Sequence, residues 1–370
     1  MTSDNSTLSP FASLPSELLW SILRLAAPPT IAMLPDGDRP PFAIKSAHLL
    51  SLVNTILKDK ISLVYVCKCW RAIANEFLYE EVVVNDDTGW QLLAVLQTTA
   101  AAAGDASAGY GKYVRCIRTH RIGLHGIILI PDFLRCCPNL QILYEPDIES
   151  NIDVKHLLWR SRGNLAKLGP ALAHSPLVSL RAMFWGEGTL DSETQQTAYS
   201  YLLEILEHAP NVVFLSIPSS PKSFQHLQHA MAKHPLAGKN IKYLELQSVP
   251  RTWILPARTW DVMLKFCPNL SEISHHVGRP VIIMSSADTT VKCLRLHLSS
   301  VLPPSENTLG AVSPELTFLT GAIVPSLERV VLHGNWSAVA NIPTFRSIEN
   351  ALMSNGRRLI FADGAPTIRG

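Results

Sequence analysis

The chain repeats one short pattern: an apolar helix-like run, a Pro-Asn or Pro-Ser pair, and a strand-like run. The two clearest copies are residues 133–140 (Phe-Leu-Arg-Cys-Cys-Pro-Asn-Leu) and residues 263–270 (Met-Leu-Lys-Phe-Cys-Pro-Asn-Leu). A third copy spans residues 205–212, and a fourth ends at Leu327. A unit this small has one apolar face that only its neighbours can bury, so the repetition predicts an extended array of stacked units.

The strand-like runs fit the spacing L-x-x-L-x-L, which is typical of leucine-rich repeats. The fullest match begins at Leu327 and ends with Asn335. Eight runs fit the spacing fully or in part, and their first positions are Val114, Leu140, Leu177, Val212, Ile241, Leu270, Val291 and Leu327. The intervals between them are uneven. The predicted fold class is therefore α/β, with an irregular leucine-rich-repeat-like solenoid over residues 85–365.

The N-terminal region has a helical period instead. Apolar side chains recur there every three or four residues, which predicts an amphipathic helix that Pro15 opens and residues 28–29 (Pro-Pro) end. A second helix is predicted over residues 61–79 for the same reason. The β-branched residues 80–84 predict the start of a strand. The apolar positions of the two helices are Leu14, Leu18, Ile22 and Leu25, then Leu63, Val66, Trp70, Ile73 and Phe77.

The composition excludes several partner classes. Among 370 residues, 32 Lys and Arg face 30 Asp and Glu, a net charge of +2. This balance gives no general attraction to nucleic acid or to an anionic membrane, so neither is an expected partner. Apolar runs fall short of the roughly 18 residues that span a bilayer, and residues 1–10 do not resemble a secretory signal.

The cysteines indicate a reducing compartment. There are seven, crowded at Cys67/Cys69 and Cys136/Cys137, which does not suggest a spaced disulfide framework. We therefore expect a cytoplasmic or nuclear location, with the cysteines acting as small buried apolar side chains. Cys67 has no second cysteine pair near it in the sequence, so a packed thiol is expected there rather than a metal or redox site.

Motifs for catalysis or cofactor binding are absent from the sequence. It contains no G-x-S-x-G, no P-loop and no H-E-x-x-H motif, so we expect no enzyme activity, no cofactor and no metal. His226, His229 and His234 share a helix-like stretch, and the first two would lie on one face. Metal ligation would need a further ligand that the sequence does not indicate, and solvated histidines on a polar helix face are the favoured interpretation.

Two N-terminal segments, in this order, resemble an F-box. Residues 14–23 begin Leu-Pro-Ser-Glu-Leu, and residues 63–71 contain Val-Cys-Lys-Cys-Trp. The family pattern begins with a Leu-Pro-x-Glu-Leu helix and ends with a Val-Cys-x-x-Trp helix. The continuation at residues 77–82, followed by irregular leucine-rich units, looks like the large fungal group of F-box proteins. The family joins its helices by a shorter stretch, so residues 28–60 carry an insertion relative to it.

The resemblance implies a substrate-receptor subunit of a Skp–cullin–F-box ubiquitin ligase. The N-terminal helices would bind the Skp adaptor and, through it, a cullin, while the repeats would hold an unidentified protein substrate. Some of the helix residues must also form the core of the helical domain itself, and the sequence does not divide them. The predicted adaptor-binding residues are Leu14, Pro15, Leu18, Leu19, Ile22, Leu63, Val66, Cys67 and Trp70.

The alternative is a leucine-rich-repeat scaffold whose F-box-like helices only cap the solenoid, because a terminal repeat needs a cover for its apolar face. Both interpretations share one organisation. It consists of a flexible tail over residues 1–12, an F-box-like helical domain over residues 13–84 with the insertion at 28–60, the solenoid over residues 85–365, and a tail over residues 366–370.

Overall fold

The computed structural model describes most of the repeats and both parts of the helical region. The described residues are 14–27, 57–84, 88–104, 109–119, 124–144, 168–170, 172–173, 177–186, 192–218, 221–247, 257–276, 290–297, 326–334, 336, 340 and 343–362. The two predicted tails lie outside these residues. So does the predicted insertion, except for residues 57–60, which are helical.

Within the described residues, ten strands form one parallel sheet, and their order in the sheet is their order in the sequence. Parallel neighbours need a crossover connection. Each connection here places the next strand directly beside the preceding one. The predicted α/β class is confirmed, and the sequential order makes the fold solenoid-like. The strands are β1 (Glu81–Val84), β2 (Cys116–Thr119), β3 (Ile142–Tyr144), β4 (Ala182–Phe184), β5 (Phe214–Pro218), β6 (Tyr243–Gln247), β7 (Glu272–His276), β8 (Cys293–His297), β9 (Arg329–His333) and β10 (Arg358–Phe361).

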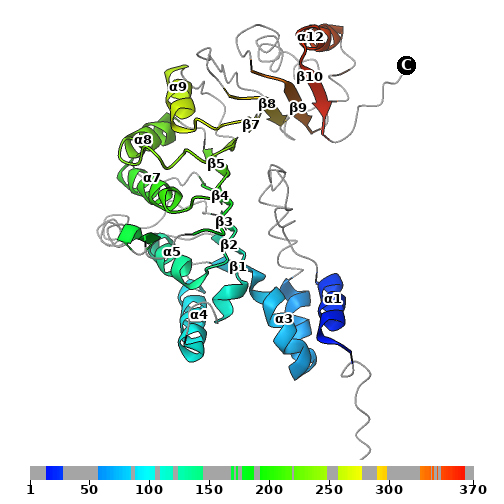
Figure 1. Cartoon of the computed structure of the whole chain (residues 1–370), viewed down its shortest axis with the longest axis vertical. Coiled ribbons are helices and arrows are strands. Elements are labelled where there is room, and N and C mark those ends of the chain that lie inside the picture. Colours follow the sequence, from blue (N-terminus) through cyan, green and yellow to red (C-terminus); the bar gives the residue numbers. More distant parts are fainter. Residues whose placement is uncertain are drawn as a thin grey trace, which may run out of the picture.

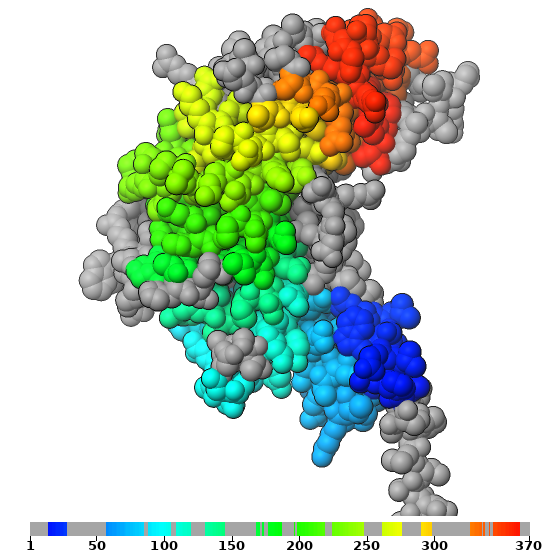
Figure 2. Space-filling view, viewed as in Figure 1, coloured from blue at the N-terminus to red at the C-terminus, as the bar shows by residue number. Residues whose placement is uncertain are grey.

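The strands line the inner side of an arc, and α4, α5, α7, α8 and α9 lie along its outer side (Figure 1). At the end near β1, α1 and residues 57–80 form a blue lobe that projects from the arc (Figure 2). None of the described helices is long and apolar enough to cross a bilayer. Residues 57–66 are helical, and the other helices are α1 (Ser16–Ala26), α3 (Lys68–Glu80), α4 (Gly89–Ala103), the 3-10 helix η2 (Tyr110–Tyr113), α5 (Leu124–Cys136), α7 (Ser192–Glu207), α8 (Pro221–Met231), α9 (Ala257–Phe266) and α12 (Pro343–Ser354).

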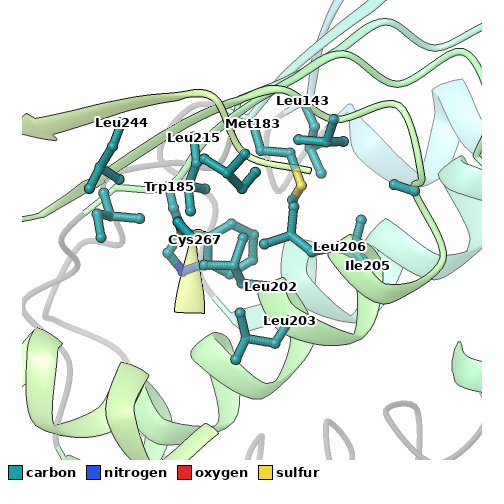
Figure 3. Close-up of a cluster of buried hydrophobic side chains, with 14 of the residues drawn as sticks. Leu143, Met183, Trp185, Leu202, Leu203, Ile205, Leu206, Leu215, Leu244 and Cys267 are labelled. Carbon is teal, nitrogen blue, oxygen red and sulfur yellow. The ribbon is translucent and has the colours of Figure 1, made fainter. Parts of the chain in front are cut away.

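The main core lies between the sheet and these outer helices. Successive side chains of a strand point to opposite faces of the sheet, so one register row of each strand faces the helices. Met183, Leu215 and Leu244 share such a row and are buried. Leu202 and Leu206 of α7 approach them from the helix side (Figure 3). Each unit therefore buries its apolar face against the next, as the repetition predicts.

Eight strand-like runs were expected, and each leads into one of the strands β2 to β9. Their eight first positions are all at most 5% exposed. The repeat pattern is shifted in the β4 unit. Met183 pairs with Leu143, which is the second apolar position of the β3 unit, so the first position of the β4 unit is Leu180 rather than Leu177. Leu177, Leu180 and Met183 are spaced three apart, so the sequence pattern fits two registers there.

The Pro-Asn pairs join successive units. In each case an asparagine Nδ2 donates a hydrogen bond to a backbone carbonyl of the preceding unit, which satisfies a polar group that the strand pairing leaves open. Asn240 makes the same bond, although no proline precedes it. The pairs are Asn139 to Lys112 (2.8 Å), Asn211 to Val178 (2.6 Å), Asn240 to Pro210 (2.8 Å) and Asn269 to Lys239 (2.7 Å).

The single helix predicted over residues 61–79 is wrong, because the helix is interrupted at Cys67. This residue is extended (φ −163°, ψ 172°), and its Sγ accepts a hydrogen bond from the Trp70 amide at 3.5 Å. Such a cap satisfies one of the amides that lack a partner at a helix start. At the first helix, Pro15 is the cap rather than the first helical residue, with α1 beginning at Ser16.

Two further expectations need correction at this end. The sheet begins at Glu81, which pairs with Cys116, so β1 belongs to the sheet although residues 81–84 were assigned to the helical domain.

The expectation of buried cysteines holds for four thiols and fails for Cys67 and Cys69, which are exposed. Burial raises the pKa of Cys267 to about 12 and that of Cys293 to about 11. The buried four are Cys116, Cys137, Cys267 and Cys293.

Candidate protein-interaction surface

The N-terminal lobe has a small core of its own. Leu19 and Leu23 of α1 are four residues apart, which places them on one side of the helix. They are buried together with Phe77 of α3, in a cluster separate from the core of the repeats. Three partly buried side chains complete this core: Leu63, Trp70 and Ile73.

Polar contacts fix α1 against α3. The guanidinium of Arg24 donates to both carboxylate oxygens of Glu80, at 2.5 Å and 2.8 Å, and this hydrogen bonding raises the pKa of Arg24. Trp20 Nε1 donates to Glu76 Oε2 at 3.3 Å, and Arg24 also lies 5.2 Å from the centre of the Phe77 ring. Because a bidentate arginine–carboxylate pair has a specific geometry, α1 is held in one orientation.

The neighbouring side of α1 is apolar as well, and it is exposed. Leu18, Ile22 and Leu25 have exposed fractions of 54%, 43% and 83%. At about 100° per residue, these three side chains fall within about 60° of one another around the helix. They therefore form a continuous apolar stripe, which we call the α1 stripe. The α1 helix thus has two apolar faces: one is buried in the lobe and the other faces solvent.

Residues 57–66 add Ile61, Tyr65 and Val66 to the exposed apolar side chains of the lobe. Together with Trp20 and the α1 stripe, these make seven of the thirteen exposed large hydrophobic side chains among the described residues. The lobe is a small part of the described chain, so the exposed apolar side chains are concentrated in it. A concentration of exposed apolar side chains, of which the α1 stripe is continuous, is typical of an interaction site.

The predicted adaptor-binding residues fall into two groups. Leu19, Leu63 and Trp70 pack in the core of the lobe, and Leu14 is half-buried. The others are exposed: Pro15, Leu18, Ile22, Val66 and Cys67. The sequence did not single out Leu25 as a binding residue, nor Ile61 and Tyr65. For Leu25 the signal was present, because it continues the period of Leu18 and Ile22.

The sheet face opposite the helices is a second candidate surface, and near β2 to β5 it is aromatic. The rings of Tyr144 and Phe184 stack at 4.1 Å with an interplanar angle of 5°, and Phe214 follows at 4.9 Å from Phe184. Arg118 lies 4.8 Å from the Tyr144 ring and pairs with the buried carboxylate of Glu81. Phe184 and Phe214 are buried, so this part of the face is not open for docking.

The same face is charged near β7 to β9. Glu272 accepts a hydrogen bond from Arg295 Nε at 2.8 Å and pairs with the more exposed Arg329. Arg295 lies 3.3 Å from His333 Nε2, and the rings of His297 and His333 stack at 4.4 Å. Two arginines therefore share one carboxylate in this part of the face.

A cavity of about 300 Å³ lies where residues 57–60 meet the first unit of the sheet. Leu57, Leu78 and Val82 line it around the side chain of Lys60. Burial lowers the pKa of Lys60, although the charges of Glu80 and Glu81 act in the opposite direction. Tyr79, Glu81 and Thr88 line the same cavity.

A scan of the chain against protein-family models gives no match, and a search of curated proteins finds no match either. The structural observation that bears on function is the exposed apolar surface of the lobe.

Proposed function

We propose that this protein is a substrate-receptor subunit of a Skp–cullin–F-box ubiquitin ligase and has no catalytic activity of its own. In this proposal the lobe is an F-box and the sheet is a leucine-rich-repeat-like array. The observation that carries it is the α1 stripe, which stays exposed although α1 already fills the core of the lobe with Leu19 and Leu23. An apolar face of this kind is stabilised when a protein partner removes it from water.

The geometry of the stripe suits a partner that offers an apolar groove. Leu18, Ile22 and Leu25 stand at positions i, i+4 and i+7, which is the anchor spacing of helix-in-groove recognition. The F-box resemblance of residues 14–23 points to the Skp adaptor as the protein that covers this face. The adaptor in turn would join the chain to a cullin.

In the same proposal the repeats hold a protein substrate. The part of the sheet face near β7 to β9 is the favoured contact, because the side chain of Arg329 is 45% exposed there. The aromatic part near β4 and β5 is less suitable, since its rings are already buried.

A scaffold with capping helices is the second candidate, and one contact favours it. The rings of Tyr79 and Tyr110 stack at 4.7 Å, and Asn75 Nδ2 lies 3.5 Å from the Tyr110 hydroxyl, so α3 touches the first unit of the array. A helix that served only as a cap would turn its apolar faces towards the sheet. The α1 stripe faces solvent instead. A capping role therefore does not explain why this stripe is apolar.

Titration of the purified chain with purified Skp adaptor tests the proposal. We expect binding at micromolar concentrations or tighter, and a loss of at least a hundredfold in Leu18→Asp, because a carboxylate in an apolar interface loses its hydration. Val178→Asp is the matched control, since Val178 is equally exposed but lies in the repeats. Failure of the wild-type chain to bind would refute the proposal.

Deletion of residues 1–80 separates the two candidates. The remaining chain begins at β1, so the whole sheet is kept. If the lobe is an independent docking module, the deleted chain stays soluble and folded. If the helices cap the array, the exposed first unit makes the deleted chain aggregate.

A further inference from the structure

The cavity at the junction of the lobe and the array is built from both regions. Lys60 belongs to the helical residues 57–66, and Leu78 lies on α3. Val82 comes from β1, and Leu92 lies in the first turn of α4. A molecule in this cavity would therefore contact the lobe and the first unit of the array at the same time.

The size of the cavity suits a small molecule. Its volume of about 300 Å³ is at the lower end of the roughly 300–1,000 Å³ that is usual for ligand pockets. An apolar cavity of about 150 Å³ holds one benzene molecule, so the junction has room for an alkyl chain or an aromatic ring together with a small polar group. The apolar part of the lining consists of leucine and valine side chains: Leu57, Leu78, Val82, Val83 and Leu92.

Lys60 places a positive charge in this apolar lining. The residue is only 3% exposed, and a charge so far from water is costly unless another group compensates it. Of the described residues, Glu80 and Glu81 attract the ammonium through their charges, but neither accepts a hydrogen bond from it. Burial therefore has the larger effect and lowers the pKa of Lys60.

Arginines already engage both of these carboxylates. Glu80 accepts two hydrogen bonds from Arg24. Glu81, which also lines the cavity, pairs with Arg118 in a contact that is buried on both sides. Among these described charges, the ammonium of Lys60 is thus the cation without an ion-pair partner. An anion in the cavity would supply the missing counter-charge.

Two residues with hydroxyl groups line the same cavity. Tyr79 stacks on Tyr110 at 4.7 Å, and burial raises the pKa of its phenol, so the hydroxyl keeps its proton at neutral pH. Thr88 precedes α4, and its side chain does not cap this helix. An ammonium and hydroxyl groups all donate hydrogen bonds, and a carboxylate has two oxygens that accept them.

We propose that this cavity binds a small carboxylic acid with an apolar body, and that the carboxylate of the acid pairs with Lys60. One carboxylate matches one ammonium in charge, while the leucine and valine side chains cover the body of the ligand. A peptide terminus offers the same carboxylate on a larger body, and the volume of the cavity favours the small acid. This site goes beyond the proposed ligase function and does not depend on it.

Isothermal titration calorimetry of the full chain with octanoate tests the site. We expect one equivalent of octanoate to bind with a dissociation constant of about 100 μM or tighter. Octanamide has nearly the same shape and no charge. It should bind at least tenfold more weakly, because it brings no counter-charge to Lys60.

Substitutions at two neighbouring lysines show whether the charge of Lys60 is responsible. Lys60→Met keeps the apolar stem of the side chain and removes the ammonium. It should weaken octanoate binding at least tenfold and abolish the preference for octanoate over octanamide. Lys58→Met is the matched control, since Lys58 is exposed two residues earlier and its loss should change neither affinity.

A third variant fills the cavity instead of changing its charge. Leu92 is partly buried, so Leu92→Trp should place its larger side chain in the cavity and weaken the binding of both octanoate and octanamide at least tenfold. This variant replaces Lys60→Met if the latter fails to give the far-UV circular dichroism of the wild type. Octanoate should also raise the melting temperature of the wild type and not that of either variant, because only the native state holds the intact cavity.

The outcomes that overturn the proposal are distinct. The wild type could bind no stoichiometric octanoate, or it could bind octanamide as tightly. Lys60→Met could keep the full preference for octanoate, or Leu92→Trp could bind both probes as the wild type does. Acetyl-Gly-Gly-Leu, which carries its carboxylate on a peptide, should bind more weakly than octanoate. Tighter binding of this peptide would assign the cavity to a chain terminus and overturn its assignment to a small acid.

Discussion

The repeats and the N-terminal lobe use their apolar residues in opposite ways. In the repeats, each strand directs its apolar row towards the outer helices, and the eight repeat-defining positions are at most 5% exposed. In the lobe, α1 buries Leu19 and Leu23 but leaves Leu18, Ile22 and Leu25 in water. A stacked unit finds its cover in the next unit of the same chain. The lobe has apolar surface beyond what its own core needs, and we infer that another protein covers it.

The largest expected effect contrasts one leucine from each region. Leu244 is fully buried between strand and helix, so Leu244→Ala should lower the free energy of unfolding by about 2–5 kcal/mol. Leu18→Ala should change it by less than about 0.5 kcal/mol, because the side chain is already half exposed. Urea unfolding followed by circular dichroism measures both. Similar losses in the two variants would break the comparison.

The next effect concerns how α1 is held. Arg24→Met removes two hydrogen bonds to Glu80 while keeping the apolar stem of the side chain. Hydrogen bonds to charged groups contribute about 1.5–3 kcal/mol, so amide exchange in residues 16–26 should become roughly 10–100-fold faster. Exchange in the repeat strands should stay as it is. Glu80→Gln should have a similar effect, and the double variant should add little to either.

A smaller loss is expected where two repeats are joined. Asn240→Asp removes the donor that reaches the Pro210 carbonyl, at nearly constant size. Such a bond contributes about 1 kcal/mol, which should appear in urea unfolding of the repeats. Lys233→Ala, an exposed change nearby, is the control. If Asn240→Asp is as stable as the control, the asparagine links do not stabilise the stacking.

The smallest effect depends on pH and lies at the junction of the two regions. Because burial lowers the pKa of Lys60, the folded state releases this proton at a lower pH than the unfolded chain does. Between that lowered pKa and the ordinary lysine value of 10.5, the unfolded chain binds more protons, so stability rises with pH. The wild type should therefore gain stability relative to Lys60→Met across this window. Urea unfolding of both proteins from pH 7 to pH 10 measures the difference, and a constant difference would contradict it.

The sequence predicted the repeats better than the lobe, for a physical reason. Apolar spacing and the Pro-Asn pairs are local signals, and they located β2 to β9 with one register shift at Leu180. β10 was missed because Leu359 and Phe361 are partly buried at the sheet edge and no Pro-Asn pair precedes them. In the lobe, Leu18 and Leu19 are adjacent and chemically identical, so only the packing of α1 on α3 assigns one to the surface and the other to the core.

Side chains brought together from distant segments gave no signal in the sequence. Glu204, Glu207 and His234 meet only because α7 and α8 stack as successive units. The helix break at Cys67 was equally hidden, since a cysteine is an uncommon cap and the apolar period continues across it.

Amide hydrogen exchange with and without the Skp adaptor tests the central claim most directly, because it reports on both regions of one chain. We expect the adaptor to slow exchange in residues 16–26 and 57–70, with no change in strands β2 to β9. Leu18→Asp should abolish this protection. Protection of the sheet instead, or none in residues 16–26 at adaptor concentrations well above micromolar, would contradict the assignment of the lobe as the docking surface.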